Sequence, residues 1–113
     1  MARSVLLSSA IAATALGSLA IATAQARQRV PATYTIAIDK MAFGPTPSGL
    51  HVGDAITWVN HDLFRHTATA ADGSFDLDLP PGKSGRVTLK RAGTLAFSCT
   101  FHPGMKGVLV VLP

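Results

Sequence analysis

The sequence has 113 residues, of which ten are Lys or Arg and six are Asp or Glu, and its formal net charge is +4. This length excludes a second sizeable domain, and the mild, dispersed positive charge is not a nucleic-acid-binding signature. Cys99 is the only cysteine, which excludes an intramolecular disulfide.

The first 26 residues are typical of a secretory signal peptide. Arg3 is followed by a stretch rich in Leu, Ala and Ile, and this stretch ends in small residues. Two small-x-small patterns predict cleavage after Ala24 or after Ala26, and retention of the segment as a membrane anchor is the alternative. We therefore expect a signal peptide over residues 1–26, one domain over residues 27–113, and a periplasmic protein with no stable membrane association once the leader is cleaved.

The remaining sequence alternates between apolar and polar residues with the period of a β-strand. Residues 27–31 are expected to form a frayed lead, and turn residues separate the segments that follow. The predicted strands are residues 33–38, 50–52, 56–58, 66–70, 74–79, 86–90, 94–99 and 108–112. No segment after the leader has the spacing of an amphipathic helix, so the sequence predicts an all-β, single-domain antiparallel sandwich or barrel.

Residues 99–105 carry three kinds of metal donor within seven positions. Cys99, His102 and Met105 supply a thiolate, an imidazole and a thioether at the spacing Cys-x2-His-x2-Met. Together with a second histidine, these donors form the set that is typical of an electron-transfer copper site. Zinc accepts Cys and His, but it has little use for a thioether.

The second histidine is expected to come from a different strand. His66 has the same parity as two small apolar residues of its strand, which places it on the inward face. Cys99 has the inward parity of its own strand, so the two side chains can meet at one end of a sandwich. His61 competes with His66 for this role but lies in a polar loop, and His51 is interpreted as structural.

The sequence resembles the cupredoxins, the small blue-copper proteins, and among them the amicyanin and plastocyanin-like groups. The stretches that carry this resemblance are Met41 with Phe43, residues 52–60, His66-Thr67, and residues 99–105. The resemblance implies a Greek-key β-sandwich with one type 1 copper ion, Cu(I)/Cu(II), bound by His66, Cys99, His102 and Met105. Many members have Asn after the first His ligand, and Thr67 occupies that position here.

The function implied by the resemblance is electron transfer by a monomeric, non-enzymatic periplasmic carrier. The donor would be a dehydrogenase or a c-type cytochrome, and transient docking is expected near an apolar group of residues that comprises Leu63, Phe64, Phe101 and Pro103. The alternative is a periplasmic copper-buffering or copper-delivery protein, although the chain lacks the Met-rich or His-rich tracts that favour delivery. An enzyme is disfavoured because reaction at copper needs an open coordination position, and a zinc-binding or metal-free adhesion domain is a further alternative.

Overall fold

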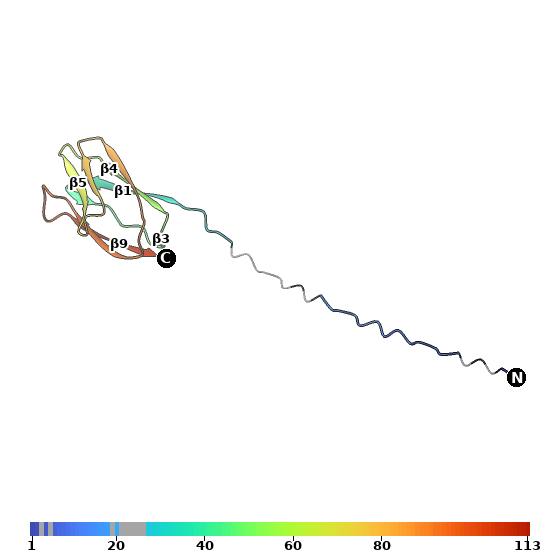
Figure 1. The fold of residues 1–113 in the computed structure, drawn as a ribbon. Helices are drawn as coiled ribbons and strands as arrows, with labels where there is room; N and C mark the ends of the chain where they lie inside the picture. Colours follow the sequence, from blue (N-terminus) through green and yellow to red (C-terminus); the bar gives the residue numbers. More distant parts are fainter. Residues whose placement is uncertain (3, 5, 19, 21–26) are drawn as a thin grey trace.

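The computed structural model describes residues 1–2, 4, 6–18, 20 and 27–113. Among these residues it contains nine strands and no helix, so the all-β prediction is confirmed (Figure 1). The strands are β1 (Thr33–Asp39), β2 (Ala42–Phe43), β3 (Leu50–His51), β4 (Ala55–Asn60), β5 (His66–Ala70), β6 (Asp76–Leu79), β7 (Ser84–Thr88), β8 (Gly93–Ser98) and β9 (Lys106–Leu112).

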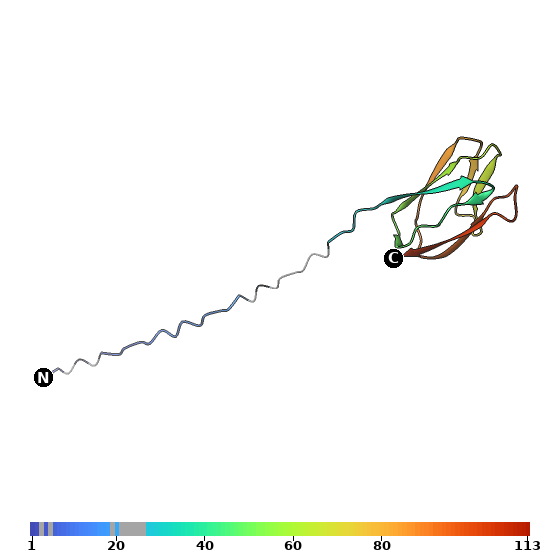
Figure 2. The same cartoon turned by 180° about the vertical axis from the view of Figure 1, so that it is seen from behind.

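The strands form two sheets that pack as a sandwich (Figures 1 and 2). One sheet has the order β2-β1-β4-β7, and the other has the order β3-β9-β8-β5-β6. The pairing is mixed rather than purely antiparallel, because β1 pairs with β4 and β3 pairs with β9 in parallel. Between β1 and β4 the chain passes through β3 of the other sheet, and such a crossover allows two strands of one sheet to run in the same direction.

The boundaries of several strands differ from the prediction. β7 begins at Ser84, two residues earlier than expected, because Ser84 and Gly85 pair with Val59 and Trp58 of β4. β3 and β2 are only two residues long, and β9 extends to Lys106. The inner faces nevertheless follow the predicted alternation, so the periodicity located the core correctly.

Aromatic side chains fill the centre of the sandwich. The ring of Phe97 packs against Trp58 and Phe43 with centroid separations of 5.5 and 4.8 Å, and all three belong to or contact the buried core. Gly107 makes room for this ring, because a Cβ at that position would lie 2.2 Å from Phe97. Burying a large apolar side chain of this kind stabilises the fold by roughly 1.5–3 kcal/mol, and it fixes the strand that leads into Cys99.

The segment before β1 is tied to the sandwich rather than frayed. Arg29 donates two hydrogen bonds of 2.8 Å to the fully buried carboxylate of Asp54. The same carboxylate accepts the backbone N–H groups of Ala32 and His51. The turn before β4 and the residues before β1 therefore share one buried anion.

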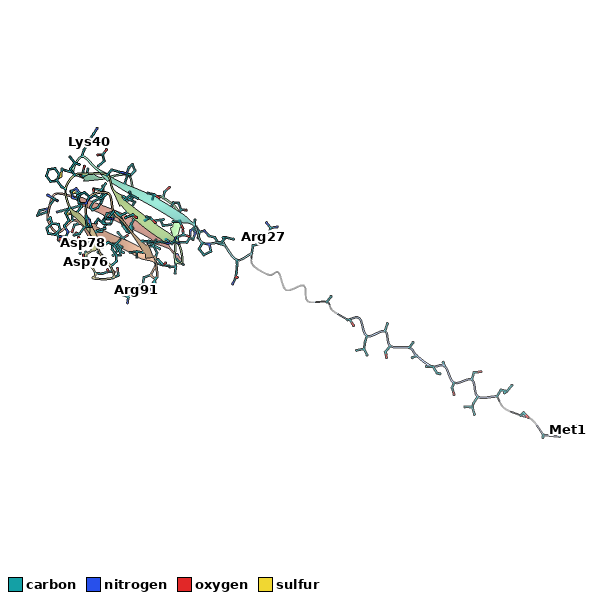
Figure 3. All side chains as sticks on the ribbon, turned by 90° about the horizontal axis from the view of Figure 1, so that it is seen from above. Met1, Arg27, Lys40, Asp76, Asp78 and Arg91 are labelled. Carbon is teal, nitrogen blue, oxygen red and sulfur yellow. The ribbon has the colours of Figure 1, made fainter. Side chains whose placement is uncertain are left out.

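The described residues of the first 20 positions are exposed and belong to neither sheet. Figure 3 shows Arg27 on the extended stretch that leads into β1, whereas Lys40 lies on the domain in the turn after β1, so the chain enters at the other end of this strand. The predicted cleavage patterns, residues 22–26, fall outside the described residues. Within the described part of the chain, no helix is long and apolar enough to cross a membrane.

We expect the domain to lose stability at low pH through Asp54. The hydrogen bonds from Arg29 and the Ala32 N–H hold the pKa of this carboxyl well below its ordinary value. A lowered folded-state pKa stabilises the fold fully above the unfolded pKa of about 4, and this contribution is lost as the pH falls further. Asp54→Asn should lower Tm at neutral pH and flatten the fall of Tm below about pH 4.

Thermal unfolding across this range, followed by circular dichroism, measures the effect. Asp39→Asn is the matched control, because it removes the same charge from an exposed position of β1. If Asp54→Asn and the control have the same Tm profile as the unaltered protein, Asp54 does not anchor the N-terminal segment.

Candidate metal centre

Three donor side chains from two separate segments meet at one end of the sandwich. His66 opens β5, Cys99 directly follows β8, and His102 lies in the loop after it. The two Nδ1 atoms are 3.2 Å apart, and Cys99 Sγ lies 3.9 Å from His66 Nδ1 and 3.6 Å from His102 Nδ1. The parity prediction for His66 and Cys99 is thus confirmed: both are fully or almost fully buried and both point inward.

The spacing of these atoms fits a metal ion bound between them. Zinc, a first-row metal, binds imidazole nitrogen at about 2.0 Å and thiolate sulfur at about 2.3 Å. In a trigonal plane these bond lengths separate the two nitrogens by about 3.5 Å and each nitrogen from the sulfur by about 3.7 Å. The observed separations of 3.2, 3.6 and 3.9 Å lie close to these values, so the pocket has the dimensions of a trigonal metal site.

The loop that carries His102 is closed by its own backbone. Met105 N–H donates to the carbonyl of His102 at 2.9 Å, and Cys99 N–H donates to the carbonyl of Met105 at 3.1 Å. These bonds return the chain to the core, where the Met105 side chain is buried. Pro103 and Gly104 lie exposed at the tip of this tight turn, as the spacing of the motif predicted.

The surroundings of Cys99 favour its thiolate form. Burial alone raises the pKa of the thiol, but the Thr67 N–H group hydrogen-bonds the sulfur and, together with the two neighbouring imidazoles, lowers the pKa to about 6. The Thr67 N–H donates to Sγ at 3.3 Å. Because the thiolate is the form that binds metals, the pocket prepares the sulfur for a soft metal ion.

Thr67 links the two ligand segments, although it is shorter than the Asn found in many cupredoxins. Its Oγ1 accepts the backbone N–H of Thr100 at 2.9 Å and lies 3.3 Å from the Thr100 hydroxyl. Thr67, which follows His66, is therefore hydrogen-bonded to Thr100, which follows Cys99. The substitution preserves the connection between the two segments.

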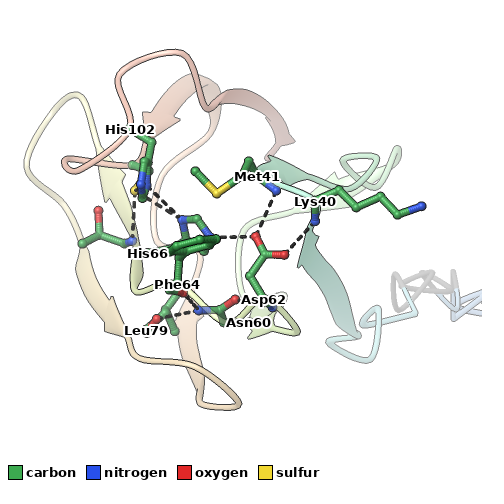
Figure 4. A network of polar contacts seen from close by, with 10 residues as sticks. Lys40, Met41, Asn60, Asp62, Phe64, His66, Leu79 and His102 are labelled. Atoms are coloured by element: carbon green, nitrogen blue, oxygen red, sulfur yellow. Dashed lines mark hydrogen bonds and ion pairs between the residues drawn. The ribbon is translucent and has the colours of Figure 1, made fainter.

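Asp62 and Met41 lie at the site but were not assigned to it from the sequence. Asp62 Oδ2 lies 2.8 Å from His66 Nε2, and the Met41 side chain lies beside His66 (Figure 4). The Met41 N–H is the main cause of the lowered pKa of Asp62, so this carboxyl is ionised near neutral pH. In the sequence, the signal that could have identified Asp62 was its position four residues before the candidate ligand His66.

The other two histidines are not part of the cluster. The side chain of His61 is exposed, and its backbone N–H donates to the carbonyl of Ile38. His51 Nδ1 lies 2.9 Å from the carbonyl of Gly49 in a turn. Among the described residues, His66, Cys99 and His102 form the cluster of potential metal donors.

The same architecture occurs in a known family of copper proteins. Residues 9–111 match the cupredoxin-like domain family. This chain belongs to the cupredoxins. The cluster of His66, Cys99 and His102, with Met105 and Met41 nearby, is a type 1 copper site of the kind typical of amicyanin.

The relatives of this cupredoxin include several amicyanins. It is 32% identical to amicyanin-alpha of Methylorubrum extorquens over 96% of this chain and 98% of that protein. It is 25% identical to the amicyanin of Paracoccus versutus over 90% and 92%. A solved structure of an amicyanin mutant in the Cu(I) state has a TM-score of 0.56 at 32% identity and covers 70% of this chain and 81% of that one. None of these names is that of an enzyme, in agreement with the expectation for this protein.

We expect Thr67→Val to weaken the connection between the ligand segments. Val has nearly the same shape but no acceptor for the Thr100 N–H, and one hydrogen bond contributes about 0.5–1.5 kcal/mol to stability. Chemical denaturation of the metal-free protein should show a loss of this size in the free energy of unfolding. Thr67→Ser keeps the hydroxyl and should retain most of the stability; if it loses as much as Thr67→Val, the methyl group rather than the hydrogen bond is responsible.

Proposed function

We propose that this cupredoxin is a periplasmic electron carrier in which His66, Cys99, His102 and Met105 bind one copper ion. The observation that carries the proposal is the convergence of two imidazole Nδ1 atoms and one sulfur within 4.8 Å of one another, with a buried methionine in the same loop. Two nitrogen donors with a thiolate and a weak axial thioether are the ligands of electron-transfer copper sites.

The protein's contribution to electron transfer is to hold these donors still. Copper supplies the one-electron couple between Cu(I) and Cu(II), and the barrier to exchange grows with any rearrangement of the donors. His66 and Cys99 are packed in the core, and their segments are joined through Thr67 and Thr100. The loop with His102 is closed by its own hydrogen bonds, so neither ligand segment is free to shift.

Electrons would enter and leave through His102, whose side chain is only partly buried. Three large apolar side chains of the adjoining loops are exposed: Leu63 by 90%, Phe64 by 60% and Phe101 by 54%. We call these three residues and the exposed Pro103 the apolar patch. A small apolar patch suits the weak, short-lived encounters of redox proteins, and a dehydrogenase or a c-type cytochrome is the donor class that this carrier would serve.

Two other functions fit the same copper site less well. Copper buffering or delivery needs no redox partner and therefore gives no role to the apolar patch. An enzyme would need an open coordination position for its substrate, whereas the proposed four donors complete the coordination of the metal.

The predicted leader and the amicyanin relatives support export to the periplasm.

We expect Cu(II) to turn the purified, metal-free protein intensely blue at one ion per chain. The colour comes from charge transfer between the Cys99 sulfur and copper, and reduction to Cu(I) should bleach it reversibly. Cys99→Ser should abolish the band, which absorption spectroscopy during copper titration measures. A colourless complex in the unaltered protein, or a blue band retained in Cys99→Ser, would contradict the assignment.

We expect Phe64→Asp to slow electron transfer to cytochrome c while the blue absorption stays unchanged. A charge within the apolar patch has to be desolvated on docking, and a loss of roughly 1.4 kcal/mol at such a position corresponds to a tenfold lower rate constant. Stopped-flow mixing of the reduced protein with oxidised cytochrome c measures this rate.

Val110→Asp is the matched control for this experiment. It places the same charge at an exposed apolar position of β9, which belongs to neither ligand segment. If both variants slow the reaction equally, net charge rather than the apolar patch controls docking. If Phe64→Asp has no effect, the patch is not the docking surface.

A further inference from the structure

The carboxylate of Asp62 connects His66 to the turn between β1 and β2. Its two oxygens accept three hydrogen bonds, from the backbone N–H groups of Lys40 at 2.7 Å and Met41 at 2.9 Å, and from His66 Nε2 at 2.8 Å (Figure 4). The side chain of Asp62 is only 10% exposed. One carboxylate therefore bridges a candidate copper ligand and a part of the chain more than twenty residues away.

The turn that supplies two of these donors has an unusual backbone. Asp39 pairs with Ala42, so Lys40 and Met41 form a two-residue hairpin turn, and both have positive φ values, 51° and 62°. Asn-Gly and similar pairs are the usual choice at such a turn, because side chains other than Gly, Asn and Asp are disfavoured there. Strain of this kind persists only where the surroundings hold it, and here both strained residues donate to Asp62.

The hydrogen bond to Asp62 also determines which nitrogen of His66 is free. A neutral imidazole carries one N–H group, and the carboxylate acceptor requires that hydrogen to be on Nε2. Nδ1 then has a free lone pair, and it is the atom that faces Cys99 Sγ and His102 Nδ1. Carboxylate partners of this kind orient metal-bound histidines and raise their basicity.

We propose that Asp62 is a positioning residue of the copper site, which acts through His66 and is itself held by the Lys40–Met41 turn. It sets the metal-binding tautomer before copper arrives, and its negative charge stabilises Cu(II) relative to Cu(I), which lowers the redox potential. The second part rests on the proposed role of His66 as a copper ligand.

The tautomer is tested first, in the metal-free protein. Nitrogen-15 NMR of the unaltered protein should show His66 with hydrogen on Nε2 and not on Nδ1, and Asp62→Ala should give a mixture of the two forms. A dominant Nδ1–H form in the unaltered protein would overturn the proposal. This measurement needs neither copper nor a stable variant, so it remains decisive if Asp62 variants fold poorly or if the chain does not carry electrons.

The potential is tested in the copper-loaded protein. Loss of such a partner typically weakens metal binding by about 10–100-fold, and each tenfold loss for Cu(II) relative to Cu(I) corresponds to a rise of about 59 mV for a one-electron couple. Asp62→Asn should therefore raise the potential in a spectroelectrochemical titration, and Asp62→Glu, which keeps the carboxylate, should restore part of the difference.

Asp78→Asn is the matched control, because Asp78 is an exposed acidic residue on β6, opposite Thr67 in the ladder and bonded to Arg65 rather than to a ligand. It should leave the potential close to that of the unaltered protein. Equal shifts in Asp62→Asn and Asp78→Asn, or no shift in either, would overturn the proposal, because Asp62 would then act only as a surface charge or a structural contact. If the unaltered protein is blue but the potentials give such a result, only the proposal about Asp62 is overturned, and the proposed electron-carrier function still stands.

Discussion

The site depends on one constraint: two imidazole nitrogens and a sulfur are held within bonding distance of a single point at one end of the sandwich. Such a pocket is unfavourable without a metal, because donors that repel or compete for protons face one another at 3.2 to 3.9 Å. The backbone keeps them in place. The amide groups of Thr67 and Thr100 bond the two ligand segments to each other, and the amide of Met105 closes the loop that carries His102. The geometry is therefore imposed by the fold rather than by the metal.

The sheets explain why the donors come from segments that are distant in the sequence. β5 pairs with β8 through Thr69 and Ser98 in antiparallel register, which sets His66 beside the loop that follows Cys99. The strand before Cys99 is fixed by Phe97, whose ring fits only because Gly107 lies opposite it. The packing of Phe97 in the core therefore also fixes the position of Cys99, which lies two residues further along the chain.

The sequence was sufficient to predict the inward faces and the ligand loop. It was not sufficient to predict contacts that depend on how distant segments pack together. Alternation placed His66 and Cys99 on inward faces, and the spacing of residues 99–105 identified the loop. The parallel pairs could not be predicted, since they depend on which sheet each short strand joins. The role of Asp62 depends on a turn between β1 and β2 that lies far away in the chain, and no local pattern reveals that proximity.

The burial of Cys99 has a consequence for the protein before it acquires its metal. A thiol whose pKa is about 6 exists largely as the thiolate at neutral pH, which is the form that oxidants attack and that itself attacks disulfide bonds. Cys99 is nevertheless only 1% exposed, and the chain has no second cysteine to pair with it. The packing around Cys99 in the metal-free protein therefore shields its reactive sulfur from oxidants and from disulfide bonds of other molecules.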